Sequence, residues 1–265
     1  MYYDAHQHLH DSRLAPFREA ILQELPGLGI AGGIVNGTSE ADWSAVELLC
    51  GAHRWLRPAF GLHPWYVKER TGGWEKSLSD FLERHPEASI GETGLDCWIE
   101  GHDIEDQKRV FIRQLEMARE RNVVITIHCV KAHEPLRQVL QKHAVPVRGF
   151  LLHAWAGPPA LTPFLLERGA HFSFPPYFLH ERKGPQRSLF QELPADRVLV
   201  ETDAPDLLPP PEQNRNPLVN PDSGKPVNHP ANLLLAYEAL AGLRGDAPEA
   251  LAAAVAANWK RLFSG

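Results

Sequence analysis

Two histidines separated by one residue stand near the start of the chain, in Asp4-Ala5-His6-Gln7-His8. In an extended backbone, residues i and i+2 point to the same side, so both imidazoles can reach one metal ion. Further histidines and acids follow short apolar runs that are typical of strands. Together these candidate site residues are His6, His8, His63, Glu92, His128, His153 and Asp203. Their number and chemistry predict a metal site.

The types of side chain limit which ions fit. Neutral imidazole with carboxylate suits Zn, Mn, Fe, Co or Ni, whereas Mg prefers a more oxygen-rich shell. The set offers more ligands than one tetrahedral ion needs. We therefore expect two divalent ions bridged by one carboxylate, with their identity open among Zn, Mn, Mg, Ni, Co and Fe. Such paired ions are the usual machinery for phosphoester cleavage.

Strand-like and helix-like segments alternate along the chain and would position these residues. Eight strand/helix pairs in one domain-sized chain predict an α/β fold, the (β/α)8 TIM barrel, as a single domain over residues 1–265. A doubly wound open sheet is the alternative, but no G-x-G-x-x-G follows a strand. The predicted strands are Tyr2–Ala5, Gly32–Asn36, Arg57–Phe60, Ala88–Gly91, Val123–Ile127, Gly149–Leu152, Ala170–Ser173 and Arg197–Glu201. The predicted helices include Ser39–Cys50, Trp74–Arg84, Ile104–Arg121, His133–Lys142, Pro158–Arg168 and Pro248–Phe263.

A barrel explains why distant residues would form one site. The carboxyl ends of all its strands meet at one face, where such enzymes keep their active sites. The candidate residues stand at predicted strand ends, so we expect them to converge there. The Pro- and Asn-rich segment Ala204–Pro230 follows the eighth strand and is expected to be a long structureless loop over the same face.

Composition excludes several classes of protein. The net charge is −6 with no block of Lys or Arg, which argues against bulk electrostatic capture of nucleic acid. It leaves room for an enzyme that holds phosphates locally with metal ions. The three cysteines lack C-x-x-C spacing and favour a reduced, cytoplasmic protein. The first strand starts almost at Met1, leaving no room for a signal peptide, and no apolar run approaches the ~20 residues of a membrane span. No obligate protein partner is expected.

The order of the motifs resembles the TatD family of metal-dependent hydrolases, within the amidohydrolase-like barrels. The motifs are D-x-H-x-H, G-x-H-P, I-G-E-x-G-L-D, a histidine after each of the fifth and sixth strands, and E-T-D-A-P. The resemblance covers nearly the whole chain. TatD-like proteins are typically divalent-metal-dependent deoxyribonucleases, and the better-studied ones remove nucleotides from 3′ ends. The resemblance therefore implies a DNA substrate, held locally at the metal site and cleaved by a water that two metal ions activate.

The resemblance also implies a role for each residue. His6, His8 and Asp203 would hold one ion, and His128 and His153 would hold the other. Glu92 would bridge the two ions. Asp203 is in addition the best candidate to accept the proton of the attacking water, so Asp203 and Glu92 are the expected catalytic residues. His63 resembles a substrate-side residue rather than a primary ligand.

Two positions depart from the family pattern. Many relatives carry an Arg two residues after the strand-five histidine, where this chain has His128-Cys129-Val130-Lys131. Lys131 would replace that charge without the bidentate geometry of Arg, and we expect it to contact a substrate phosphate together with His63. The usual small hydroxyl after the strand-six histidine is missing from His153-Ala154-Trp155-Ala156-Gly157. Metal binding should survive both changes.

Several alternatives stay open at this stage. Asp4 could orient a metal ligand or make a structural hydrogen bond, and Asp96 could support the site or only a turn. Tryptophans near the expected barrel mouth could stack on bases, although ordinary loop packing is favoured for Trp65, Trp98 and Trp155. The same metals could instead cleave an amide, lactone or carboxylic ester. A metal-binding scaffold protein is disfavoured, because buried carboxylates are costly without a metal and a purpose.

Overall fold

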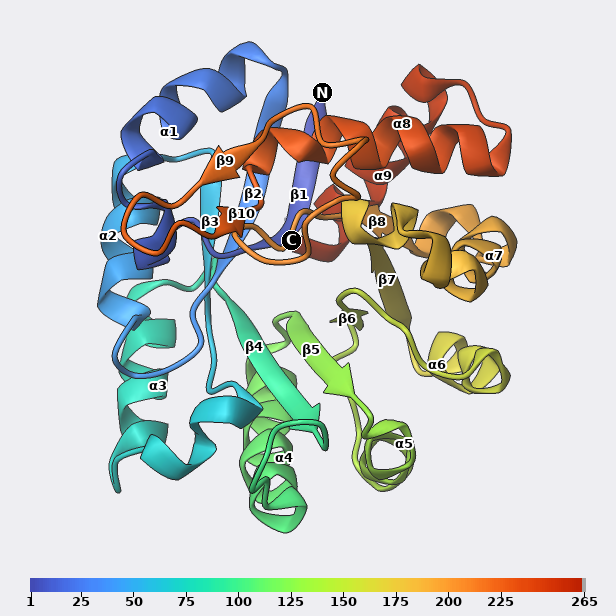
Figure 1. The fold of residues 1–265 in the computed structure, drawn as a ribbon. Coiled ribbons are helices and arrows are strands. Elements are labelled where there is room, and N and C mark those ends of the chain that lie inside the picture. The colour runs from blue at the N-terminus through green and yellow to red at the C-terminus, as the bar shows by residue number, and fades with distance from the viewer. Residues whose placement is uncertain (264–265) are drawn as a thin grey trace. The chain divides into compact units, whose positions relative to one another are not determined.

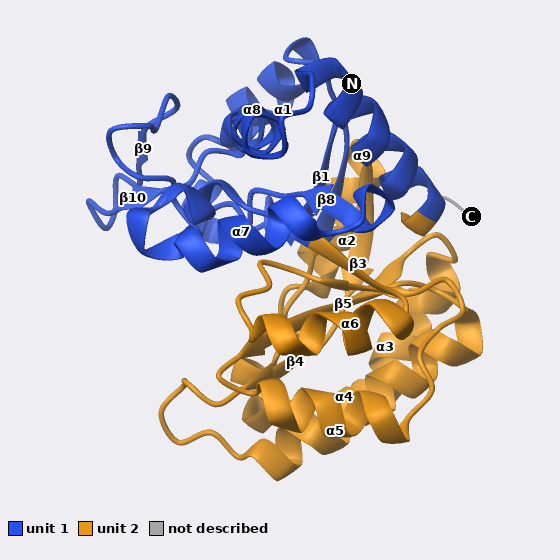
Figure 2. Cartoon of the chain, turned by 90° about the vertical axis from the view of Figure 1, so that its right-hand side faces the viewer, with its two compact units in different colours: residues 1–35, 173–261 blue, residues 36–172, 262–265 orange. Residues whose placement is uncertain are grey.

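The computed structural model describes residues 1–263 of the 265-residue chain. Eight strands form one sheet in the order of the chain, β1 to β8, and helices alternate with them (Figure 1). This is the strand order of the predicted (β/α)8 fold. The chain divides into two compact units, drawn in different colours in Figure 2. Unit 1 comprises Met1–Val35 and Ser173–Arg261, and unit 2 comprises Asn36–Phe172 with the end of the chain.

All eight predicted strands are present, with shifted ends. They are β1 (Tyr2–Gln7), β2 (Ile30–Asn36), β3 (Leu56–Phe60), β4 (Ser89–Asp96), β5 (Ile125–Val130), β6 (Phe150–Leu152), β7 (Ala170–Phe174) and β8 (Val198–Val200), followed by the antiparallel pair β9 (Leu218–Val219) and β10 (Pro226–Val227). The α-helices are α1 (Arg18–Gly27), α2 (Trp43–Ala52), α3 (Trp74–Arg84), α4 (Ile104–Arg121), α5 (His133–Lys142), α6 (Thr162–Glu167), α7 (Gly184–Glu192), α8 (Leu233–Arg244) and α9 (Pro248–Phe263). No helix within residues 1–263 is both long and apolar enough to cross a bilayer.

Four details of the predicted elements were wrong. The helix expected from Ser39 begins at Trp43, because the Asp42 carboxylate accepts hydrogen bonds from the backbone N–H groups of Thr38 and Ser39 and holds a turn there. The helix expected over Pro158–Arg168 is split into a 3-10 turn and α6. The segment Ala204–Pro230 is not structureless, since it contains β9 and β10. Helices α1, α7 and α8 were not identified.

In unit 2, β4 and β5 are paired in parallel over the region that contains Glu92 and His128. Their register pairs Gly94 with His128 and Asp96 with Val130, so Glu92 and His128 lie inside strands rather than after them. The pairing is close at Gly94, whose φ is +140°. A Cβ atom there would stand 2.0 Å from the His128 carbonyl oxygen, so only glycine fits.

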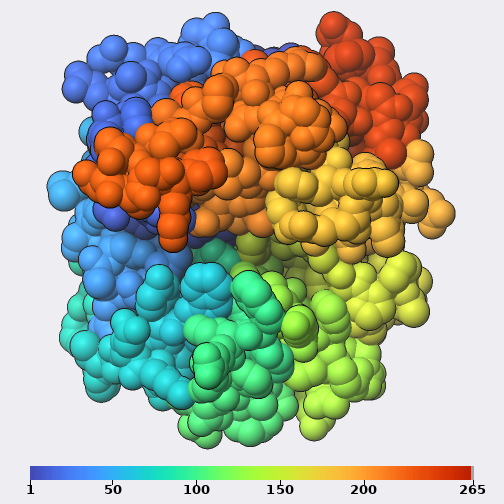
Figure 3. All heavy atoms as spheres, viewed as in Figure 1, coloured from blue at the N-terminus to red at the C-terminus, as the bar shows by residue number. Residues whose placement is uncertain are grey.

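In unit 1, the end of β1 is bonded to the chain that follows β8. The Asp203 N–H donates to the His6 carbonyl at 2.9 Å, and the His8 N–H donates to the Ala204 carbonyl at 2.7 Å. The segment that follows Ala204, orange in Figure 3, lies at the surface in that view. Arg13 ties its start to the β1 loop through a two-pronged ion pair with Asp206.

Replacement of Gly94 by alanine tests the close β4–β5 pairing. The added methyl group must push the two strands apart, so Gly94→Ala should lower the free energy of unfolding by roughly 2–4 kcal/mol. Gly27→Ala is the matched control, because a Cβ at Gly27 meets nothing within 4 Å. Urea denaturation of both variants provides the measurement. Equal stability of Gly94→Ala and wild type would contradict the pairing.

Candidate metal centre

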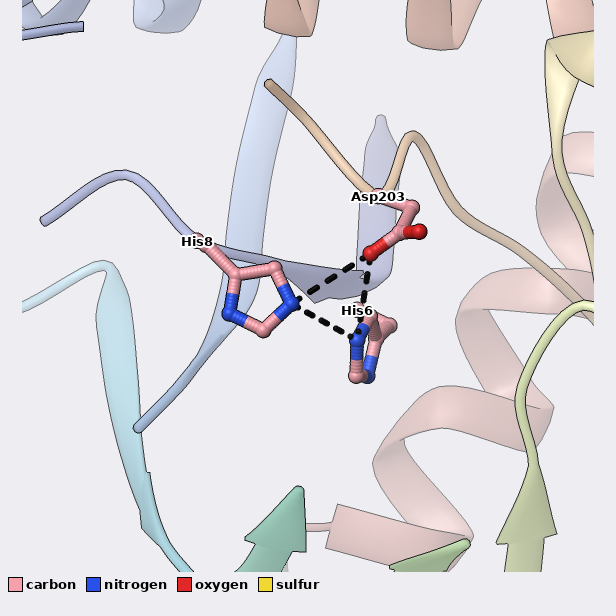
Figure 4. Close-up of side chains that lie close together, drawn as sticks. All are labelled: His6, His8 and Asp203. Carbon is pink, nitrogen blue, oxygen red and sulfur yellow. Dashed lines mark hydrogen bonds and ion pairs between the residues drawn. The ribbon is translucent and has the colours of Figure 1, made fainter. Parts of the chain in front are cut away.

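The first cluster lies in unit 1 and consists of His6, His8 and Asp203 (Figure 4). The two Nε2 atoms are 3.2 Å apart, and each lies 3.3 Å from Asp203 Oδ1. Ligands about 2.0–2.1 Å from a tetrahedral ion lie roughly 3.3 Å from one another. All three side chains are buried. The three donor atoms therefore have the mutual spacing of a metal's ligands.

Two backbone features position this cluster. His6 belongs to β1 and His8 follows it at i+2, so both rings project to one side. Asp203 has a φ of +54°, a left-handed conformation that costs of the order of 1 kcal/mol outside glycine. Its hydrogen bond to the His6 carbonyl stabilises this conformation. One carboxylate oxygen faces the imidazoles, while the other points away from them in Figure 4.

Asp4 holds the two ends of the first cluster together. Its Oδ1 accepts hydrogen bonds from the backbone N–H groups of His6 and Thr202, both at 3.1 Å, and its Oδ2 lies 2.6 Å from Thr202 Oγ1. Complete burial raises the pKa of Asp4 to about 8, although these hydrogen bonds lower it, and nearby Glu201 adds to the rise. Asp4 thus makes structural hydrogen bonds, as one alternative expected. The same bonds position the backbone at His6 and at Thr202, next to Asp203, which is what the other alternative required.

The second cluster lies in unit 2 and is centred on Glu92 Oε1. Three imidazole nitrogens surround this oxygen: His153 Nε2 at 2.8 Å, His128 Nδ1 at 2.9 Å and His63 Nε2 at 3.3 Å. The His153 and His128 nitrogens are 3.4 Å apart. All four side chains are buried. Strands β3 to β6 therefore each contribute one residue: Glu92 and His128 from within β4 and β5, and His63 and His153 from just past β3 and β6.

The hydrogen-bond partners of His128 and His63 indicate which ring nitrogens carry protons. A carboxylate oxygen faces each ring nitrogen of His128, Asp96 Oδ2 at 2.9 Å from Nε2 and Glu92 Oε1 at 2.9 Å from Nδ1. Burial lowers the pKa of His128, but the hydrogen bonds with Asp96 and Glu92 outweigh burial and raise that pKa. With the Nε2 proton held by Asp96, the Nδ1 position is the one where a proton or a cation would lie between the imidazole and Glu92. In His63 the pattern is reversed. Its Nδ1 accepts the Trp65 backbone N–H at 3.2 Å, which leaves the proton on Nε2. His128 therefore directs a ring nitrogen at Glu92 that could coordinate an ion, whereas His63 directs an N–H at it.

Asp96 supports both the site and a turn. Its Oδ1 accepts the backbone N–H groups of Trp98 at 2.6 Å and Ile99 at 3.1 Å. Burial raises the pKa of Asp96, but the hydrogen bonds from His128 and Trp65 outweigh burial and hold that pKa well below its usual range. Asp96 therefore carries a negative charge that fixes the orientation of the His128 ring.

Two buried glutamines of α4 were missed by the sequence analysis. Gln107 forms two hydrogen bonds with the Asp96 backbone, at 2.8 and 3.0 Å, and Gln114 forms two with the Leu62 backbone, at 2.8 and 3.1 Å. They share the face of α4 that buries Val110 and Phe111. Amide side chains at positions i and i+7 of an apolar helical face are the signal that could have revealed them.

The charges of the buried residues fit a divalent cation. Within residues 1–263 the buried side chains include several acids but no Lys or Arg. Buried acids in unit 1 include Asp4, Glu201 and Asp203, and those in unit 2 include Glu92 and Asp96. Buried charge is costly unless it is paired or coordinates a metal. The imidazole and carboxylate donors of each cluster are the set that Zn and the late first-row ions prefer.

Two other predicted positions lie outside these clusters. Lys131 directly follows β5 with a φ of +52°, and its exposed side chain forms no hydrogen bond or ion pair within residues 1–263. Trp155 is buried, so its side chain packs inside the protein and is not available to stack on a nucleobase. Trp65 and Trp98 are instead exposed. The three cysteines are free, and two of them are buried.

Comparison with known proteins identifies the family. Residues 3–264 match the family model described as TatD related DNase. The chain belongs to this family. A protein named 3′-5′ ssDNA/RNA exonuclease TatD, from Erwinia billingiae, is 30% identical over 98% of both chains. The protein of that name from Escherichia coli K12 is 28% identical, again over 98% of both chains.

Solved structures of TatD proteins have the same fold. The structure of YJJV, a TatD homologue from Escherichia coli K12, matches with a TM-score of 0.89 at 24% identity, over 100% of this chain and 98% of that chain. A TatD family hydrolase from Entamoeba histolytica matches with a TM-score of 0.86 at 15% identity and the same coverage. The predicted resemblance and the predicted (β/α)8 fold are confirmed.

The raised pKa of Asp4 makes a prediction for the metal-free protein. Its pKa rises from 3.8 to about 8 on folding, so the folded state binds the proton more tightly than the unfolded state. Its contribution to stability is complete below about pH 4 and is lost as the pH rises through 8. Asp4→Asn mimics the neutral carboxyl. The melting temperature of Asp4→Asn relative to that of wild type should therefore increase as the pH rises from 5 to 9.

Thermal unfolding in EDTA at several pH values measures this difference. Asp222→Asn is the matched control, because Asp222 is an exposed residue of the same unit. A constant difference between Asp4→Asn and wild type across this pH range would show that Asp4 is ionised when buried.

Proposed function

We propose that this protein is a divalent-metal-dependent exonuclease that releases nucleotides from the 3′ ends of single-stranded nucleic acid. The observation that carries the proposal is the presence of two convergent imidazole–carboxylate clusters in a chain that matches the TatD related DNase family over residues 3–264. Relatives matched over 98% of the chain are named 3′-5′ ssDNA/RNA exonucleases. DNA is therefore the expected substrate, and RNA is a second one.

In this proposal each cluster holds one divalent ion. His6, His8 and Asp203 hold the first, and His128 and His153 hold the second together with Glu92. The bridging role expected of Glu92 stays a prediction. Divalent ions in such sites act as Lewis acids and lower the pKa of water towards ~7, which makes hydroxide available near neutral pH. Asp96 keeps the His128 lone pair directed at the site, since it binds the opposite ring nitrogen.

Proton transfer falls to Asp203. One of its oxygens is occupied by the contacts with His6 and His8, while the other points away from both rings (Figure 4). That second oxygen is the acceptor proposed for the proton of the attacking water. The carboxylate therefore serves as ligand and general base through different atoms.

Substrate binding is proposed for His63 and Lys131. The His63 tautomer places a donor N–H on Nε2, beside Glu92, where it can bond a non-bridging phosphate oxygen. Lys131 is an exposed cation at the end of β5, one strand further along the sheet than the Glu92 strand. A protein with a net charge of −6 needs such local positive charge to hold a polyanion.

A substrate and metal panel tests the proposed function. Wild type loaded with Zn, Mn, Mg, Ni, Co or Fe should shorten single-stranded DNA from its 3′ end, and EDTA should abolish the activity. Glu92→Gln should lower turnover roughly a hundredfold or more, because it removes charge from the centre of the second cluster. The control is Glu83→Gln, since Glu83 is an exposed carboxylate of α3.

Three outcomes would overturn the proposal. Cleavage that persists in EDTA would remove the metals from the reaction. Normal turnover and metal content of Glu92→Gln would show that Glu92 is misassigned. Rapid hydrolysis of a carboxylic ester, amide or lactone with no cleavage of nucleic acid would leave a metallohydrolase with another substrate class.

Lys131→Ala tests the phosphate contact. Loss of one cation should raise KM for single-stranded DNA several-fold and leave kcat nearly unchanged. One lost phosphate contact should also make the dependence of log KM on log salt shallower by about 0.7. Lys142→Ala is the matched control, because Lys142 is an exposed lysine at the other end of α5. An unchanged salt dependence in Lys131→Ala would remove this residue from the binding site.

A further inference from the structure

Two exposed indoles follow neighbouring strands of unit 2. Trp65, after β3, is 43% exposed, and Trp98, just past the end of β4, is 64% exposed. Tryptophan combines a large apolar ring with a polar N–H and is enriched at binding interfaces for this reason. Four of the seven tryptophans of the chain are buried, namely Trp43, Trp74, Trp155 and Trp259. Trp65 and Trp98 are therefore candidates for contact with a ligand.

Both tryptophans are anchored to Asp96. Trp65 Nε1 donates to Asp96 Oδ2 at 2.8 Å, and the Trp98 backbone N–H donates to Asp96 Oδ1 at 2.6 Å. Lys68 braces the same two loops by donating to the Gly101 carbonyl at 2.6 Å. An aromatic ring held in place before binding loses little conformational entropy when a ligand stacks on it.

The anchored Trp65 ring adjoins the Glu92 cluster. The Trp65 ring centroid lies 5.2 Å from that of His63 and 6.4 Å from that of His128. The carboxylate that holds the Trp65 indole also holds the His128 imidazole, at 2.9 Å. A planar group stacked on Trp65 would therefore adjoin side chains of the proposed reaction site.

We infer that Trp65 and Trp98 form a stacking subsite for nucleobases of the strand whose end is cleaved. The inference rests on the proposed nuclease function and adds how the strand is held. Every base offers a flat π-face, so stacking tolerates any sequence. Bases of a duplex are already stacked on both sides. The subsite therefore favours single strands over duplexes and gives little base preference.

Trp98 allows a clean test, because its side chain forms no hydrogen bond within residues 1–263. Trp98→Ala in the metal-loaded enzyme should raise KM for a single-stranded oligonucleotide roughly tenfold with little change in kcat. Trp98→Phe should restore most of the affinity, since it keeps a ring. Val147→Ala is the control, because Val147 is an exposed apolar residue of the same unit.

Abasic oligonucleotides separate stacking from other causes. Wild type should bind an oligonucleotide with abasic sites at its 3′ end at least as weakly as Trp98→Ala binds the normal one. Loss of the bases should cost Trp98→Ala less affinity than it costs wild type, because only the Trp65 ring is left to stack. Trp65→Ala should also raise KM but lower kcat, because it removes a hydrogen bond from Asp96. Trp65→Phe should restore KM more than kcat.

Binding without cleavage keeps this inference separate from the proposed function. Fluorescence titration with an oligonucleotide protected by 3′ phosphorothioate linkages measures affinity directly. Wild type that binds this probe through its bases without cutting normal DNA would keep the subsite and overturn the nuclease proposal. Efficient cleavage with unchanged KM in Trp98→Ala and Trp65→Ala, or equal losses on normal and abasic strands, would overturn the subsite alone. Failure to bind or cleave would overturn both.

Discussion

The main constraint on this structure is the close approach of imidazole nitrogens and carboxylate oxygens, which face one another at 2.8 to 3.4 Å. No Lys or Arg is buried within residues 1–263 to neutralise them. Groups this close repel when their lone pairs converge, and they stay converged only when the backbone holds them and a cation or proton lies between them. The i+2 spacing of His6 and His8, the left-handed Asp203 and the glycine at position 94 each serve this end.

Buried amide side chains hold several of the segments around the clusters. Gln107 and Gln114 bind backbone groups after β4 and β3, and Asn228 donates to the Thr202 carbonyl at 2.8 Å in the segment that carries Asp203. An amide satisfies backbone donors and acceptors without adding charge. A buried Lys or Arg in these places would compete with a metal for the carboxylates. Two cations of nearby loops are paired with their own acids, Arg13 with Asp11 and Asp206 and Arg70 with Asp106.

The sequence predicted the fold and the gathering of site residues well, because both depend on short-range patterns. Short apolar runs located all eight strands, and candidate residues in or after them come together within each unit. Helix α8 was missed because its sequence is apolar nearly all round, so no polar face reveals the helical period that its buried residues follow. The inner position of Glu92 and His128 depends on how closely β4 approaches β5 at Gly94, a tertiary contact that no local pattern contains. The tautomer of His63 likewise depends on a hydrogen bond from Trp65 that only the folded chain makes.

Asp96 shows why metal affinity and substrate binding are hard to separate in this chain. One of its oxygens orients His128 and holds the Trp65 indole, and the other fixes the turn that carries Trp98. A movement of that turn must therefore change the direction of the imidazole lone pair, because both depend on one rigid carboxylate. By the reciprocity of linked equilibria, an ion bound by His128 as proposed would also restrain Trp65 and the turn that carries Trp98. In the TatD scaffold of this protein, metal loading and the grip on a single strand are thus expected to strengthen each other through Asp96.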